Sequence, residues 1–196
     1  MMRLTQAALA IADISGYTEF IRHREISLMH AEQIIADLLG AVVEGAEYPL
    51  MLNKFEGDAL LLYAEIDSDA ASVVRDVHQQ AQRFFSTFRK QQARLKEMRA
   101  HCECDACANI SRLSLKAFLH VGEITIRQWR QFTELAGEPL ILIHRLLKNH
   151  VPVQEYLLMT DAFVGLGGLE PGNVMEEPIA GLDPVLVHWV SAAASG

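Results

Sequence analysis

A nearly continuous apolar run near the start of the chain, Ala7 to Ile14, is the feature that most constrains the fold. Successive side chains of a strand point to opposite faces of a sheet, so an apolar run without alternation is typical of a strand buried on both faces. Ser15 and Gly16 follow this run and predict a turn. The sequence therefore predicts a strand inside a covered sheet, with the carboxylate of Asp13 at its exit.

The rest of the chain alternates between helical and strand periodicity. The expected elements are a helix over about 34–43, strands over 50–55 and 59–63 joined at Glu56-Gly57, a helix capped by Ser68 and running to about Met98, strands over 113–121 and 123–127 around Gly122, a helix over 138–150, and short strands over 156–160, 174–176 and 185–190 with a helical turn between them. Strand, helix, hairpin, helix, strand is the order of a ferredoxin-like βαββαβ core. We therefore predict an α+β fold with this core and C-terminal β additions.

The composition is that of a folded globular protein, because 51% of the 196 residues are hydrophobic and 21% are charged. We expect one domain over residues 1–196, with a cysteine-rich loop at about 100–110. The formal net charge of -8 argues against a nucleic-acid partner, since such binding needs clustered Lys and Arg. A nucleotide can still bind through metal ions.

The opening segment, MMRLTQAALAIADISG, carries one basic residue and a short apolar run interrupted by Asp13. It lacks the charged start and uninterrupted apolar stretch of a secretory signal, and it is too short to cross a bilayer. We therefore expect a cytoplasmic protein with no membrane partner.

Asp13 and Asp58 are the first candidates for a chemical site. Asp13 ends a buried strand, and Asp58 begins the second strand of the predicted hairpin. If the two strands are neighbours, the carboxylates converge beside a glycine turn, which suits a divalent cation carrying phosphates. The alternative is ordinary turn chemistry, because an Asp at a strand end or after a hairpin glycine is common without any ligand.

Several segments together resemble class III adenylyl and guanylyl cyclases. AIADISGYTEF resembles the opening strand and turn of that family, and NKFEGDALLLYA resembles its hairpin. LKAFLHVGEITI with AGEPLILIHRLLKNH resembles a later strand and helix, and EPIAGLDPVLVHWV a terminal strand. The resemblance covers nearly the whole chain, which also looks similar to an uncharacterised bacterial branch of cyclase-like proteins with a cysteine-rich insertion.

The resemblance implies a two-metal site for Mg²⁺ or Mn²⁺ at the start of the chain. Asp13 and Asp58 match the two metal-binding aspartates of the family. One ion would activate the ribose 3′-hydroxyl and the other would neutralise the triphosphate. The ion and phosphates would be surrounded by the backbone carbonyl of Ile14 and the amides of Ser15, Gly16, Tyr17 and Thr18.

The resemblance also implies how the base is selected. Lys54 occupies the position of the lysine with which adenylyl cyclases read adenine, and this favours ATP over GTP. Glu134 aligns with its partner position, where the family usually has aspartate or threonine. Its longer side chain puts the fit of the adenine amino group in doubt.

The positions that act on the transferred phosphate are only half retained. Arg145 matches the arginine of the family, but Ile141 stands where the asparagine belongs and has no donor. Loss of one such donor typically lowers turnover by ~10²–10³-fold. Our own interpretation of Ile141 is a core-packing residue of an apolar helix.

These matches predict a class III cyclase-like protein that binds metal–ATP at a homodimer interface, because one chain's aspartates face the other chain's Lys54 and Arg145 in the family. Weak conversion of ATP to cyclic AMP is one activity left open. The alternative is a catalytically degenerate nucleotide- and metal-binding module with a regulatory role in signalling.

The cysteine cluster HCECDACAN allows two interpretations. Thiolates in a short loop suit tetrahedral Zn²⁺, although this spacing is less diagnostic than paired C-x-x-C motifs. The other interpretation is reduced thiols without a metal. The candidate ligands are Cys102, Cys104, Cys107 and His101, with His120 and His150 as more distant nitrogens.

Overall fold

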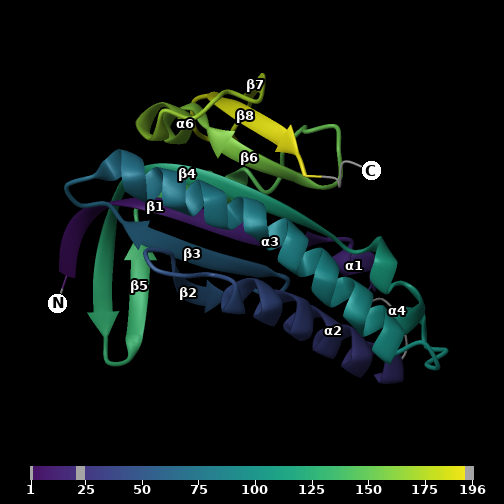
Figure 1. The fold of residues 1–196 in the computed structure, drawn as a ribbon. Coiled ribbons are helices and arrows are strands. Elements are labelled where there is room, and N and C mark those ends of the chain that lie inside the picture. The colour runs from purple at the N-terminus through teal and green to yellow at the C-terminus, as the bar shows by residue number, and fades with distance from the viewer. Residues whose placement is uncertain (1, 21–24, 193–196) are drawn as a thin grey trace.

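The computed structural model describes residues 2–20 and 25–192 (Figure 1). In chain order its elements are β1 (Met2–Ser15), α1 (Tyr17–Phe20), α2 (Glu25–Glu44), β2 (Met51–Phe55), β3 (Ala59–Glu65), α3 (Ala70–Met98), α4 (Asp105–Ala108), the 3-10 helix η1 (Ile110–Arg112), β4 (Ser114–Trp129), β5 (Phe132–Ala136), α5 (Glu138–Arg145), β6 (Tyr156–Thr160), α6 (Asp161–Gly167), β7 (Asn173–Glu177) and β8 (Val185–Ser191). The strands of the described chain join one sheet.

The sheet confirms the predicted fold class. Its order is β2-β3-β1-β4-β6-β8-β7, with β5 paired to β4. In the first four positions, β2-β3-β1-β4, each strand runs antiparallel to its neighbours, and these strands form the ferredoxin-like core. β6 joins β4 in parallel and carries β8 and β7, which are the expected C-terminal additions.

β1 is buried on both faces, as its apolar run predicts. Ala8, Ala10 and Ala12 pack in the core cluster that includes residues of α2 and α3. Leu9 and Ile11 pack in the cluster on the opposite face, which includes residues of α5 and β5. Figure 1 shows α2 and α3 lying along one face of the sheet. Because both faces of β1 are covered, the positions of Asp13 and of the turn that follows it are fixed.

The predicted strand pair around Gly122 is wrong, because Gly122 lies inside the single long strand β4 and pairs with Ala7. The chain turns later, where Arg130 adopts a φ of 53°. Gly122 is needed for packing instead, since a Cβ there would lie 2.4 Å from Cγ of Pro139. The close approach of α5 to β4, and not a turn, requires glycine at this position.

Two helix ends also differ from the prediction. The carboxylate of Asp69, not Ser68, caps α3 by accepting a hydrogen bond from the amide of Ser72 at 3.0 Å. α5 ends at Arg145, before the predicted His150. In the turn that follows, backbone hydrogen bonds join residues three apart, and the side-chain amide of Asn149 donates to the carbonyl of Leu146 at 2.7 Å. Within residues 2–20 and 25–192, no helix is both long and apolar enough to cross a membrane.

Candidate functional site

Asp13 and Asp58 lie at the same end of two neighbouring strands. Asp13, near the end of β1, pairs with Ala59, the first residue of β3. The backbone amide of Ile14 donates a hydrogen bond to the carbonyl of Asp58 at 3.0 Å. The antiparallel register therefore brings two acidic residues, far apart in the sequence, to adjacent positions.

Burial opposes the ionisation of both carboxyl groups, and the charge of Asp58 adds to this effect at Asp13. Burial, followed by the nearby charge of Asp58, raises the pKa of Asp13 to about 6, and Lys116 partly opposes this rise. Burial also raises the pKa of Asp58, against a hydrogen bond from its own backbone. Neighbouring carboxylates that resist ionisation together are stabilised by a divalent cation, because its charge cancels their repulsion. The oxygen donors fit Mg²⁺ or Mn²⁺.

A turn follows Asp13 and opens onto a cavity of about 620 Å³. Gly16 adopts a φ of 94°, which L side chains rarely allow, so the turn requires glycine. The carbonyl of Gly16 accepts from the amide of Phe20 at 3.1 Å and starts α1. Ser15 lines the cavity, and its hydroxyl is buried without a hydrogen-bond partner among the described residues. A buried orphan hydroxyl in a cavity wall is suited to a polar ligand.

The first turn of α1 is tied to α2. The hydroxyl of Tyr17 donates to Glu32 at 2.8 Å, and this bond together with burial raises the pKa of Tyr17 to about 12. Thr18 belongs to α1, but its side chain lies outside the described part of the structure. The segment that follows the Gly16 turn is thus held in place by α2.

Two cations of this cavity were missed by the sequence analysis. Lys116 pairs with Asp13 across β1 and β4, and its ammonium lies 5.7 Å from the ring centroid of Tyr156. Arg112, at the end of η1, also lines the cavity. A lysine inside the apolar run of β4 is the signal that could have identified Lys116, because a charge is costly there without a partner or ligand.

Lys54 is engaged within its own hairpin. Its ammonium lies 3.1 Å from Glu56, whose other oxygen is 2.8 Å from Nε2 of His144 on α5. Burial opposes the effect, but the hydrogen bonds from His144 and Lys54 lower the pKa of Glu56. The sequence analysis treated Glu56 only as a turn residue. It is instead the acidic centre that joins the hairpin to α5.

Glu134 is exposed on β5, and Lys54 is exposed on β2. The residues that precede them in the sequence are in contact, because the side-chain amide of Asn53 donates a hydrogen bond to the carbonyl of Thr133 at 2.8 Å. The structure therefore brings the two predicted base-contacting positions to adjoining strand segments.

α5 corrects the interpretation of Ile141. Its side chain is 49% exposed and does not belong to the core, whereas Leu140 and Ile143 point inward. The reason is the helical period: one side of α5 packs on the core, and Ile141 lies on the outer side. Arg145, one turn later, donates a hydrogen bond to the carbonyl of Ala180. The arginine is thus held by the loop before β8.

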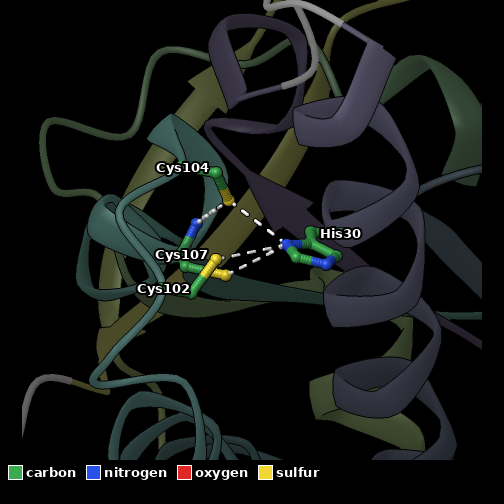
Figure 2. A group of neighbouring side chains, drawn as sticks. All are labelled: His30, Cys102, Cys104 and Cys107. Atoms are coloured by element: carbon green, nitrogen blue, oxygen red, sulfur yellow. Dashed lines mark hydrogen bonds between the residues drawn. The ribbon is translucent and has the colours of Figure 1, made fainter.

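The cysteine-rich loop folds over α2, as Figure 2 shows. Its three sulfurs gather around Nδ1 of His30, at 3.5 Å from Cys102, 3.3 Å from Cys104 and 3.6 Å from Cys107. All four ligand atoms lie within 4.8 Å of one another. Burial, followed by hydrogen bonds with the other two thiols, raises the pKa of Cys107 to about 12.

The nitrogen of this cluster was assigned to the wrong histidine. His101 is exposed and outside the cluster, since Cys102 next to it already turns its side chain toward His30. His120 is instead buried beside the Thr160 hydroxyl at 2.9 Å, and His150 bonds to Glu177 at 2.7 Å. No sequence signal marked His30, because its place beside the loop depends on helix packing.

A family model described as a protein of unknown function (DUF2652) matches residues 35–156, more than half of the chain. The chain belongs to this family. The uncharacterized protein Rv2561/Rv2562 of Mycobacterium tuberculosis is 38% identical to this DUF2652 protein over 127 residues, which are 65% of this chain and 57% of the relative. The match therefore spans just over half of that relative's length.

Solved structures confirm that this DUF2652 protein has the class III cyclase fold. The adenylyl cyclase CyaB from P. aeruginosa superposes with a TM-score of 0.74 at 16% identity, covering 97% of this chain and 95% of that one. The guanylyl cyclase Cya2 gives a TM-score of 0.77 at 11% identity, covering 96% and 92%. At such identities the similarity establishes the fold and leaves the chemistry to the residues.

Proposed function

We propose that this DUF2652 protein binds a nucleoside triphosphate, ATP in preference to GTP, as a complex with Mg²⁺ or Mn²⁺. The observation that carries the proposal is that Asp13 and Asp58 occupy adjacent positions next to a turn whose Ser15, with an unpartnered hydroxyl, lines a cavity together with a cation, Lys116. Two acidic groups, a polar turn and a lysine supply complementary charge for both halves of a metal–triphosphate complex.

Each group has a defined role in this proposal. Asp13, Asp58 and the carbonyl of Ile14 hold the cations, which when bound would neutralise the triphosphate and lower the pKa of the ribose 3′-hydroxyl. The amides of Ser15, Gly16, Tyr17 and Thr18 receive phosphate oxygens, while Lys116 and Arg112 add positive charge from the sheet and from η1.

Base selection rests on Lys54 and Glu134. Lys54 donates to a ring nitrogen of adenine, and Glu134 accepts from the exocyclic amino group. In the structure Lys54 is paired with Glu56, so nucleotide binding must draw its ammonium away from that carboxylate. Because Glu56 keeps His144 as a second partner, this exchange leaves no carboxylate unpaired.

We further propose a two-fold homodimer in which Lys54, Glu134 and Arg145 of one chain face Asp13 and Asp58 of the other. Its support is the set of large apolar side chains exposed on β2, β5 and α5, which carry these residues, and at the end of β4, which pairs with β5. Those side chains are Phe55 at 53% exposure, Trp129 at 61%, Phe132 at 64% and Ile141 at 49%. A partner subunit would cover them.

Cyclisation is weak at best in this proposal. In that reaction the ribose 3′-hydroxyl loses its proton to solvent and its oxygen bonds to the α-phosphorus. The bond between the α-phosphorus and the oxygen that bridges to the β-phosphate breaks, and pyrophosphate leaves. Ile141 offers no donor to the developing charge, and Arg145 is held by the carbonyl of Ala180. These two observations favour the second candidate function, a regulatory module that binds metal–ATP without consuming it.

Calorimetry with Mn²⁺ and a non-hydrolysable ATP analogue tests the binding proposal. We expect saturable binding by the native protein. Asp58→Asn and Lys116→Ala should each raise the dissociation constant at least about tenfold, which corresponds to a loss of about 1.4 kcal/mol of binding free energy. Asp76→Asn, an exposed change on α3, is the matched control and should leave binding unchanged. Absence of binding of any nucleoside triphosphate by the native protein would refute the proposal.

A cyclic-nucleotide assay separates the two candidate functions. The enzyme candidate predicts a slow, Mn²⁺-dependent product that Asp58→Asn abolishes, and Ile141→Asn should raise it by ~10²–10³-fold if the missing donor is the limiting group. The regulatory module predicts undisturbed binding and no cyclic product from either form.

A further inference from the structure

The geometry around His30 is not that of ordinary hydrogen bonding. Three sulfurs lie 3.3, 3.5 and 3.6 Å from the same ring nitrogen, Nδ1. That nitrogen carries either one hydrogen or one lone pair, so it can form a hydrogen bond with only one of the three thiols at a time. Two of these close approaches need another explanation.

A tetrahedral metal ion supplies that explanation. With Zn–S bonds of about 2.3 Å and a Zn–N bond of about 2.0–2.1 Å, neighbouring sulfur and nitrogen ligands of a tetrahedron lie about 3.6 Å apart. The three observed nitrogen–sulfur distances are close to this value. The cysteines are free and not joined by disulfides, and all four ligand atoms lie within 4.8 Å of one another.

Two donors of the protein face sulfurs of the cluster. The amide of Cys107 donates to the sulfur of Cys104 at 3.4 Å, because Cys104 caps the short helix α4. The guanidinium of Arg99 lies 4.0 Å from the sulfur of Cys107. Such donors offset the negative charge of a site with three thiolates and one imidazole. Thiolate-rich tetrahedral sites of this kind select zinc among the common cellular divalent ions.

We propose that His30, Cys102, Cys104 and Cys107 form a structural zinc site that clamps the α4–η1 segment onto α2. The clamp joins two walls of the cavity. α2 holds the Gly16 turn through the bond from Tyr17 to Glu32. The segment that follows the cysteines lines the same cavity as Gly16, with Asn109, Ser111 and Arg112. Zinc therefore sets the width of this cavity, and this second part rests on the proposed function.

Metal content and spectroscopy of the full chain test the site itself. Protein purified without chelators should contain about one equivalent of zinc, and the cobalt-substituted form should show thiolate-to-metal charge-transfer absorption. His30→Ala should release zinc more readily to a competing chromogenic chelator, whereas His30→Cys should retain it. His101→Ala is the matched control and should behave like the native protein.

The result that overturns the zinc site is less than about half an equivalent of metal per chain, both as purified and after incubation with zinc. This measurement needs no variant, so it holds even if a cysteine substitution prevents folding. Equal zinc loss from the His30→Ala and His101→Ala proteins would also overturn the assignment of His30.

Nucleotide binding then tests the clamp. Removing zinc from the native protein should weaken binding of the ATP analogue at least about tenfold and zinc addition should restore it. Unchanged affinity after zinc removal would overturn the clamp and leave the zinc site standing. Absence of nucleotide binding in the zinc-loaded protein would instead overturn the proposed function, so the two failures are distinguishable.

Discussion

Replacing Asp13 by asparagine removes a negative charge from a place where burial and Asp58 both oppose it. The pKa of Asp13 is raised from 3.8 to about 6, so the folded state holds this proton more tightly than the unfolded state. A group of this kind stabilises the fold fully below its unfolded pKa, and that contribution is lost as pH rises through the folded pKa. At neutral pH the ionised Asp13 therefore destabilises the metal-free protein.

The size of the effect follows from the pKa. A rise from 3.8 to about 6, at about 1.4 kcal/mol per pKa unit, corresponds to about 3 kcal/mol. Partial solvent access to the carboxylate reduces this to about 1–2 kcal/mol. We expect Asp13→Asn to raise the free energy of unfolding by that amount at pH 7.5 without metal, and to give little gain near pH 4.

Urea denaturation of the native and Asp13→Asn proteins at both pH values, with and without Mn²⁺, provides the measurement. Mn²⁺ at a hundred times its dissociation constant should stabilise the native protein by about 2.7 kcal/mol and the variant far less. The Asp76→Asn control should show neither effect, because Asp76 is exposed on α3. A metal-free variant less stable than the native protein at pH 7.5 would refute the reasoning.

Three further predictions concern packing, acid sensitivity and assembly. Gly122→Ala should lower the free energy of unfolding by about 1–3 kcal/mol in urea, because its Cβ would overlap the ring of Pro139. Burial lowers the pKa of His120 to about 4, so this group by itself should reduce native stability by up to about 3 kcal/mol as pH drops from 6.5 toward 4, and urea midpoints should show His120→Gln to be less acid-sensitive than the native protein. Phe132→Ser should shift the protein from dimer to monomer in light scattering, because it removes an exposed aromatic side chain from the proposed interface.

Local patterns were enough to predict most of the fold. The unbroken apolar run of β1 could only be satisfied by cover on both faces, and the structure places Ala8 and Leu9 in different core clusters. The sequence pattern gave a wrong prediction at Gly122, where glycine is required by a close contact with Pro139, which is remote in sequence. Glycine marks a turn and a close approach equally well, and only the packing of α5 distinguishes them.

The same division runs through the candidate sites. The neighbourhood of Asp13 and Asp58 could be inferred because strand order fixes which strand ends are adjacent. His30 could not be found, since its contact with Cys104 depends on how far α2 extends and which side it presents. Ile141 was misplaced for a related reason, because an apolar residue in a short helix does not reveal whether it faces the core or a second subunit.

The absence of a donor at Ile141 and the hydrogen bond from Arg145 to Ala180 do not weaken the case for nucleotide binding, because they concern a different part of the reaction. A donor that acts only on the developing charge of the transition state contributes to turnover and not to ground-state affinity. Of the groups proposed to hold the ground state, Lys116 lines the cavity, and Asp13 and Asp58 lie at adjacent positions next to the turn that opens onto it. A chain can therefore lose cyclisation and keep its affinity for metal–ATP, and the comparison of binding with turnover in the Ile141→Asn protein measures how far this separation has gone.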